Sequence, residues 1–229
     1  MTTLQSLKKQ ESAIDITLKL PDETTIPCHK LVLMVASPFF ATMFQSGMKE
    51  SKQPEVQLEF SDAATIRMLI DYFYSGDIDI NSDNMMDLVA ASEFLCLADL
   101  KQHLGSFMTN EIDSANCIDF YMISQKYSLT NLIPHCLEYI LSHFTEAFKE
   151  SDDFLNLTEK ELTTVLADDR LIAENEDFVF HSVVRWVNAD LEKRKGKFVQ
   201  IAALVRFPFS TQGLLDHLSL EPLMLNPTC

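Results

Sequence analysis

The hydrophobic period of this chain changes within residues 15–50, and that change limits the folds available to it. Apolar and polar residues alternate at first, which predicts a half-buried strand. The apolar positions of this strand are Ile14, Ile16, Leu18 and Leu20. Pro-Asp-Glu at residues 21–23 supplies turn chemistry, and residues 24–26 predict a short return strand. Leu-Val-Leu at residues 31–33 then opens an apolar helical segment, so a hairpin leads into a helix.

A serine–proline pair interrupts the helical pattern and predicts the start of a second helix. The hydroxyl of Ser37 can accept from a free amide of the first turn, and Pro38 suits that turn because no hydrogen bond is lost there. The helix that follows has one wide apolar face. Its members are Phe39, Phe40, Met43 and Phe44. We expect hairpin, helix, break and helix to form one cooperative unit.

The remainder of the first half predicts a mixed domain. Residues 55–59 alternate as a strand does, Asp62 begins a helix that ends at Ser-Gly, and residues 77–80 alternate again. Two further helices are expected between residues 85 and 108. Short strands among several helices indicate an α+β domain, a short sheet flanked by helices, that closes near Ile112.

Strand patterns vanish after this point, and the second half predicts helices alone. Residues 158–161, Thr-Glu-Lys-Glu, form a capping-box pattern in which hydroxyl and carboxylate each satisfy an end amide. Other expected helices cover residues 116–127, 133–148 as one long helix, 176–188 and 198–205. Consecutive helices with short connections predict an all-α domain of stacked helical hairpins.

The net charge and the cysteines limit which binding partners and which cellular compartment we expect for this chain. The net charge of −16 argues against nucleic-acid binding, which depends largely on lysine and arginine. No apolar run approaches the ~20 residues needed to span a bilayer, and the N-terminus has no signal-peptide core, so we expect no membrane partner. Five cysteines without a Cys-x-x-Cys pair favour a reduced compartment, the cytoplasm or else the nucleus.

The residues that resemble a metal site do not complete one. Asp77-x-Asp79-x-Asn81-x-Asp83 is similar to the opening of a calcium loop. Such a loop needs glycine at its sixth position and a bidentate glutamate at its twelfth, which are Ser82 and Leu88 here. The neighbouring Cys/His pairs at residues 28–29 and 135–136 have no further zinc ligands nearby in sequence. We therefore expect no metal and no cofactor.

No pattern indicates catalysis either. There is no Gly-x-Ser-x-Gly, and the five glycines form no phosphate-binding loop. Cys96, Cys117 and Cys136 lie among apolar helical positions and are expected to be packed. Cys28 stands beside histidine and lysine, so a lowered thiol pKa and a redox-sensing role remain a hypothesis for it. We expect a protein that is not an enzyme.

The first half also resembles a known family. Its segments occur in the order of the BTB (POZ) signature, although the usual glycine before the second strand is absent. These segments are Asp15-Ile16-x-Leu18, His29-Lys30-x-Val32-Leu33, Ser37-Pro38-Phe39-Phe40 and Met43-Phe44. The resemblance implies a BTB/POZ domain at residues 1–112 that dimerises and binds cullin-3.

The second half, residues 113–229, resembles the BACK domain of the Kelch-like proteins. The matching pieces are Asn116-Cys117, Phe154-Leu155-x-Leu157, Asp169-x-Leu171 and Glu176-x-x-Val179-Phe180 through Trp186-Val187. No repeat of ~50 residues with glycine pairs appears, so the Kelch propeller is not in this sequence. The chain is then either part of a longer protein or a naturally short member.

The resemblance implies a homodimer. Leu4 and Leu7 lie three apart on a weak amphipathic helix, which needs the body of the domain or a second chain to cover it. In the family the matching segment packs across the dimer interface; a frayed terminus is the alternative. Asp15 and Lys30 are similar to the family's buried acid–base pair near the dimer axis, a pairing that would offset the cost of burying either charge.

The resemblance also implies a site for the N-terminal domain of cullin-3. Met48 and Glu50 match the family's hydrophobic-x-Glu motif, in which an apolar anchor fills a pocket and the carboxylate fixes the register. Tyr74 matches a tyrosine of the same surface, and Asn116 opens a three-box at about residues 115–148 that extends it. Alternatively, Met48 is a solvated loop residue and Tyr74 an aromatic at the edge of the core.

These inferences lead to a functional hypothesis with two alternatives. The chain is expected to be a homodimeric adaptor that links substrates to a cullin-3 RING E3 ubiquitin ligase, with the substrate bound by a module outside these residues. The first alternative is a self-association scaffold that binds no cullin, which the BACK half disfavours. The second is a transcription-linked BTB protein that recruits corepressor peptides, for which the sequence offers neither zinc-finger spacing nor a basic segment.

Overall fold

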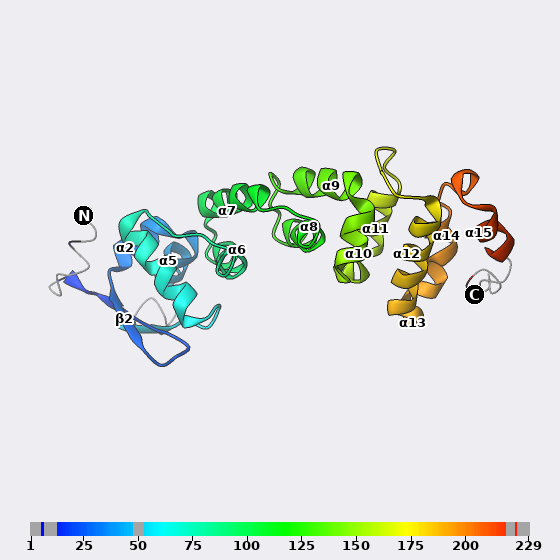
Figure 1. Cartoon of the computed structure of the whole chain (residues 1–229). Coiled ribbons are helices and arrows are strands. Elements are labelled where there is room, and N and C mark those ends of the chain that lie inside the picture. Colours follow the sequence, from blue (N-terminus) through cyan, green and yellow to red (C-terminus); the bar gives the residue numbers. More distant parts are fainter. Residues whose placement is uncertain (1–5, 7–12, 48–52, 219–222, 224–229) are drawn as a thin grey trace. The chain divides into compact units, whose positions relative to one another are not determined.

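The structure, a computed structural model, describes residues 6, 13–47, 53–218 and 223. It divides the chain into two compact units, Met1–Met108 and Thr109–Cys229, which we describe separately (Figure 1). The division falls in the last helical turns of α7 (Ala98–Asn110). Four residues predicted to belong to binding surfaces lie outside the described residues: Leu4, Leu7, Met48 and Glu50.

A small mixed sheet organises the N-terminal unit. Strand β1 (Ile16–Lys19) lies between β2 (Thr25–Cys28) and β3 (Glu55–Gln57). It pairs antiparallel with β2, where Leu18 faces Ile26, and parallel with β3. Every second residue of β1 is buried, namely Ile16 and Leu18, because one face of the sheet is covered by helices. The predicted hairpin and the strand at residues 55–59 are confirmed.

Two helices of this unit begin at the capping residues predicted for them, Ser37 and Asp62. The described helices of the unit are α2 (Lys30–Ala36), α3 (Pro38–Gln45), α5 (Ala63–Ser75), α6 (Met85–Phe94) and α7. Ser37 separates α2 from α3: its hydroxyl accepts from the amide of Phe40 and donates to the carbonyl of Leu95. Asp62 accepts from two amides at the start of α5, and Gly76 ends that helix with φ of 79°.

The strand predicted at residues 77–80 is wrong. The segment keeps the expected alternation, with Ile78 and Ile80 half-buried and the aspartates between them exposed. No described strand pairs with it, so the alternating pattern gives an extended segment without a ladder. Asn81 and Asn84 then organise the turn into α6: the side-chain oxygen of Asn81 accepts from the amides of Asp83 and Asn84.

The described residues of the C-terminal unit contain helices and no strand. The α-helices are α8 (Cys117–Lys126), α9 (Ile133–Ser142), α10 (Phe144–Glu150), α11 (Glu159–Leu166), α12 (Glu176–Ala189), α13 (Leu191–Arg194), α14 (Phe198–Ala202) and α15 (Gln212–His217). Three short 3-10 helices cover Asp153–Asn156, Lys195–Lys197 and Phe207–Phe209. The capping box of α11 is confirmed, since Thr158 and Glu161 each accept from the other's amide.

Aromatic side chains fill the centre of this unit. Phe148 stacks on Phe154 with 4.6 Å between ring centroids, and both are fully buried. Trp186 of α12 is also buried and donates from its indole nitrogen to the carbonyl of Leu157 at 2.8 Å. Such a partner is needed because a buried indole N–H without an acceptor is costly.

The single long helix predicted over residues 133–148 is wrong. It is divided at His143, whose φ of −124° and ψ of 33° leave the helical region, into α9 and α10. The hydroxyl of Ser142 donates to the carbonyls of Glu138 and Tyr139, one turn earlier. A serine bonded in this way competes with the backbone and bends a helix. The His143 ring stacks on Tyr139 at 4.3 Å, which holds the bend.

Candidate functional site

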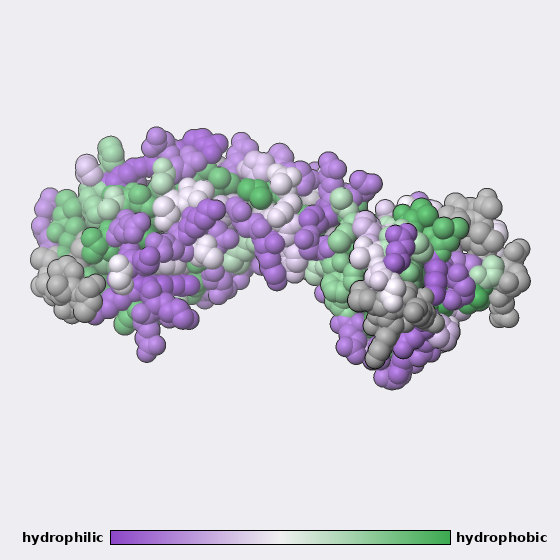
Figure 2. Space-filling model, turned by 180° about the vertical axis from the view of Figure 1, so that it is seen from behind, coloured by the Kyte–Doolittle hydropathy of each residue, from purple (hydrophilic) through white to green (hydrophobic). Residues whose placement is uncertain are grey.

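Helix α2 of the N-terminal unit carries an apolar face that the described chain leaves open. Leu31 is 70% exposed and Val35 is 81% exposed, and residues four apart lie on the same side of a helix. The opposite side carries Leu33, which is fully buried. Figure 2 shows hydrophobic surface on the N-terminal unit among hydrophilic surface. A helix that is apolar all round is usually buried on both sides, so this face predicts a partner.

Asp15 and Lys30 meet at the start of this helix, where a hydrogen bond joins them. The Asp15 carboxylate accepts from the backbone amide of Lys30 at 2.7 Å. The Lys30 ammonium lies 5.3 Å from the centroid of the Phe44 ring, a cation–π contact. Asp15 is exposed in the single chain, so burial of the pair requires a second chain. The carboxylate therefore fixes the N-terminus of α2, next to its open face.

Tyr74 of α5 is buried rather than presented on a surface. Its side chain is 1% exposed, and its hydroxyl oxygen accepts from the His29 amide at 3.0 Å and lies 2.9 Å from His29 Nδ1. Burial raises the pKa of the hydroxyl to about 12. Tyr74 therefore ties α5 to the residue that precedes α2, and its burial in the single chain is nearer to the alternative of a core aromatic than to a surface residue.

The predicted anchor segment follows α3 directly. That helix ends at Gln45, and Gly47 turns the chain with φ of 71°, a conformation that favours glycine. Met48 and Glu50 come next, outside the described residues. Their contact with cullin-3 therefore stays a prediction.

Asn116 holds the connection between α7 and α8. Its side-chain oxygen accepts from the Asp113 amide at 2.9 Å, and its nitrogen donates to the carbonyl of Glu111 at 2.7 Å. Both side-chain groups are thus used within the chain, and the residue is half-buried. Its predicted role in cullin binding would act through the position of α8, the first helix of the predicted three-box.

Three of the four cysteines that the structure describes are buried. Cys28, Cys117 and Cys136 are fully buried, so an accessible redox thiol at Cys28 is not supported. Burial raises the pKa of the Cys117 and Cys136 thiols to about 12, which disfavours the thiolate. Cys96 corrects the prediction that it is packed: it is exposed, with φ of 58° in the turn after α6.

Within the described residues, no group of three or more histidine, cysteine or acidic side chains is arranged to hold a metal ion. Among the same residues, no helix has the length and apolar character needed to cross a bilayer. The features that remain are surfaces: the open face of α2, the end of α3 and the helices that follow α7.

Family models match both units. The BTB/POZ domain model matches residues 4–112, and the model described as BTB And C-terminal Kelch matches residues 117–219. The chain is a BTB–BACK protein. Its N-terminal unit, with a three-stranded mixed sheet, is the BTB domain, and the all-helical unit is the BACK domain.

The BTB–BACK chain is homologous to Kelch-like proteins over its full length. It is 33% identical over 231 residues to Kelch-like protein 7 of Homo sapiens, with 100% of this chain and 39% of that protein covered. It is 30% identical over 224 residues to Kelch-like protein 2 of Rattus norvegicus, covering 97% and 37%. The chain thus spans about two fifths of the length of these relatives.

The BTB domain also matches a solved structure. The BTB domain of human Gigaxonin is 31% identical, with a TM-score of 0.40, over 45% of this chain and 86% of that one.

The sequence pattern does not by itself predict Leu31 and Val35 as interface residues. The signal was present: residues 31–35 are five consecutive apolar residues, which leaves no polar side for a surface helix.

Proposed function

We propose that this BTB–BACK protein is a non-catalytic homodimeric adaptor of a cullin-3 RING E3 ubiquitin ligase. The BTB domain would form the dimer and, with the three-box at about residues 115–148, bind the N-terminal domain of cullin-3. A module outside these residues would bind the substrate. The homology to Kelch-like proteins along the whole chain is the observation that carries this proposal.

The open face of α2 supports the homodimer. Leu31 and Val35 are exposed, and Asp15, which fixes the start of α2, is exposed beside it. A two-fold axis next to this face would bury the apolar side chains of both copies against each other. The same contact would remove Asp15 and Lys30 from solvent together. Leu4 and Leu7 remain proposed members of the interface.

The cullin surface is proposed around the end of α3. Met48 would fill an apolar pocket of cullin-3, and Glu50 would fix the register of the partner helix. Tyr74 would act indirectly, because its hydroxyl holds the residue that precedes α2, and α2 leads into α3. Asn116 would act in the same indirect way by holding α8.

An adaptor of this kind acts by proximity alone. It raises the effective concentration of substrate near the ligase by binding both. A dimer has two binding sites for the substrate and two for cullin-3. The buried cysteines with raised pKa values fit a role without a nucleophile.

A self-association scaffold that binds no cullin is the second candidate, because the α2 face supports dimerisation and says nothing of cullin. Gel filtration with light scattering separates the two. The adaptor predicts that the chain and the cullin-3 N-terminal domain elute as one complex with two copies of each. Separate elution of an intact dimer and free cullin would leave the scaffold as the function. Corepressor-peptide recruitment has no supporting observation in the structure.

A further inference from the structure

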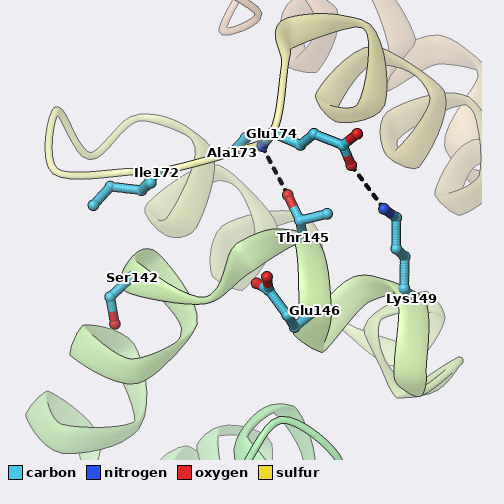
Figure 3. A pocket seen from close by; sticks show the side chains of 7 residues that line it. All are labelled: Ser142, Thr145, Glu146, Lys149, Ile172, Ala173 and Glu174. Carbon is cyan, nitrogen blue, oxygen red and sulfur yellow. Dashed lines mark hydrogen bonds and ion pairs between the residues drawn. The ribbon is translucent and has the colours of Figure 1, made fainter.

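A cavity of about 380 Å³ opens in the BACK domain beside the bend between α9 and α10. Figure 3 shows the side chains that line it, which come from these two helices and from the segment between α11 and α12. They are Ser142, Thr145, Glu146, Lys149, Ile172, Ala173 and Glu174. The cavity therefore depends on the bend at His143, because a continuous helix would carry residues 145–149 in a different direction.

The segment at residues 172–174 is fastened to both helices. The Ile172 amide donates to the carbonyl of Leu141, the penultimate residue of α9, at 2.8 Å. The Glu174 amide donates to the hydroxyl oxygen of Thr145 in α10, also at 2.8 Å, and Thr145 is buried (Figure 3). This attachment leaves Ile172 as a 64% exposed apolar side chain at the cavity.

The charges of the cavity do not cancel. The Lys149 ammonium pairs with the Glu174 carboxylate at 2.7 Å and also lies 5.3 Å from the centroid of the Phe178 ring. The Glu146 carboxylate, one turn before Lys149, has neither a hydrogen bond nor an ion pair within the described part of the chain. One carboxylate is thus available in a chain whose net charge is −16.

We propose that this cavity binds an arginine side chain of a partner protein, with an apolar neighbour of that arginine packed on Ile172. A guanidinium can bind the Glu146 carboxylate through two parallel N–H donors, a geometry that an ammonium does not offer. The acidic charge of the chain attracts a basic partner before contact. The volume lies in the range of ~300–1,000 Å³ in which proteins bind small ligands, so a side chain and its neighbours fit.

Ser142, Thr145 and Glu146 also lie within the proposed three-box, so binding is measured with the chain alone, in the absence of cullin-3. The probe is the peptide acetyl-Ala-Leu-Arg-Leu-Ala-amide, and its control replaces arginine by citrulline, which has the same shape without the charge. Fluorescence anisotropy of labelled peptide gives the dissociation constant with the full chain. Amide chemical shifts of ¹⁵N-labelled protein locate the contact.

Glu146→Gln is the test variant, and Glu192→Gln is its matched control, because Glu192 is an exposed glutamate elsewhere in the same unit. We expect saturable binding of the arginine peptide with shifts at Ala173 and Glu174. The citrulline peptide and Glu146→Gln should each weaken binding by about five-fold, the effect of one solvent-accessible charge pair. Glu192→Gln should leave the dissociation constant unchanged, and Ile172→Ser should weaken it.

Four results would overturn the proposal. Equal weakening by the two glutamate variants would mean general attraction to an acidic surface. Absence of saturable binding, or shifts that avoid residues 172–174, would exclude the cavity as the site. A weaker self-association of Glu146→Gln in sedimentation velocity would assign the cavity to a second copy of the chain instead.

Discussion

Val35→Ser should weaken the dimer without unfolding the BTB domain. The side chain is 81% exposed in the single chain, so its removal leaves the core of one protomer unchanged. In the proposed dimer the same side chain is buried against the partner, and serine would lose that apolar contact in both copies.

The structure sets the size of this effect. Complete burial of a valine side chain contributes roughly 1.5–2 kcal/mol. Because Val35 is 81% exposed, about 1.2–1.6 kcal/mol of this is available to the dimer from each copy. A symmetric interface contains the substitution twice, so the loss is about 3 kcal/mol, or about 100-fold in the dimer dissociation constant.

Sedimentation equilibrium over a range of protein concentrations measures that constant directly. Val199→Ser is the matched control, because Val199 is a 56% exposed valine on α14 of the other unit. Thermal unfolding of both variants checks that each is folded.

An unchanged dissociation constant for folded Val35→Ser would refute the α2 interface. Equal weakening by Val199→Ser would show that the effect is not local. A variant that no longer folds at concentrations where the control does would mean that Val35 supports the domain itself, which its exposure argues against.

Three further predictions concern stability and accessibility. Tyr74→Phe should lower the free energy of unfolding in urea by about 1–3 kcal/mol, because it leaves a buried amide without its acceptor; Tyr72→Phe, on the same helix, should change it little. Cys96 should be alkylated first among the described cysteines in native protein by mass spectrometry, and buried Cys117 and Cys136, each with its pKa raised to about 12, should react far more slowly; the reverse order would contradict the burial. Thr158→Ala should cost about 1 kcal/mol in thermal unfolding, since it removes the cap of α11.

Features set by neighbouring residues could be predicted from the sequence. The strand alternation at residues 16–19, the caps at Ser37 and Thr158, and the stop at Gly76 all depend on contacts within a few residues. Each appears in the structure because the local preference agrees with the fold around it.

Features that depend on distant contacts could not be predicted in the same way. The alternation at residues 77–80 is typical of a strand, but a strand also needs a neighbour, and the described chain offers none. The apolar positions from 133 to 148 keep a helical period across His143, where side-chain bonds to the previous turn divide the helix. Cys96 lies in an apolar run, yet the positive φ of its turn directs it outward.

The surroundings of the predicted binding residues also depend on distant contacts and could not be predicted from the sequence. Tyr74 was placed on the cullin surface by resemblance, and only the fold shows that its hydroxyl is used by His29 inside the domain. The exposed side of α2 could not be separated from its buried side by hydropathy, since residues 31–35 are all apolar. The side of α2 that is buried is the side covered by α3 and α5, and α5 is distant from α2 in the sequence.

Calorimetric titration of the chain with the N-terminal domain of cullin-3 is the decisive experiment for the adaptor role. We expect one cullin bound per protomer. The heat of binding should be lost in Met48→Asp, while the mass of the dimer is unchanged. Val199→Asp, which places the same charge on an exposed valine of the BACK domain, should bind as the unmodified chain does. No heat from the unmodified chain, or full binding by Met48→Asp, would contradict the account.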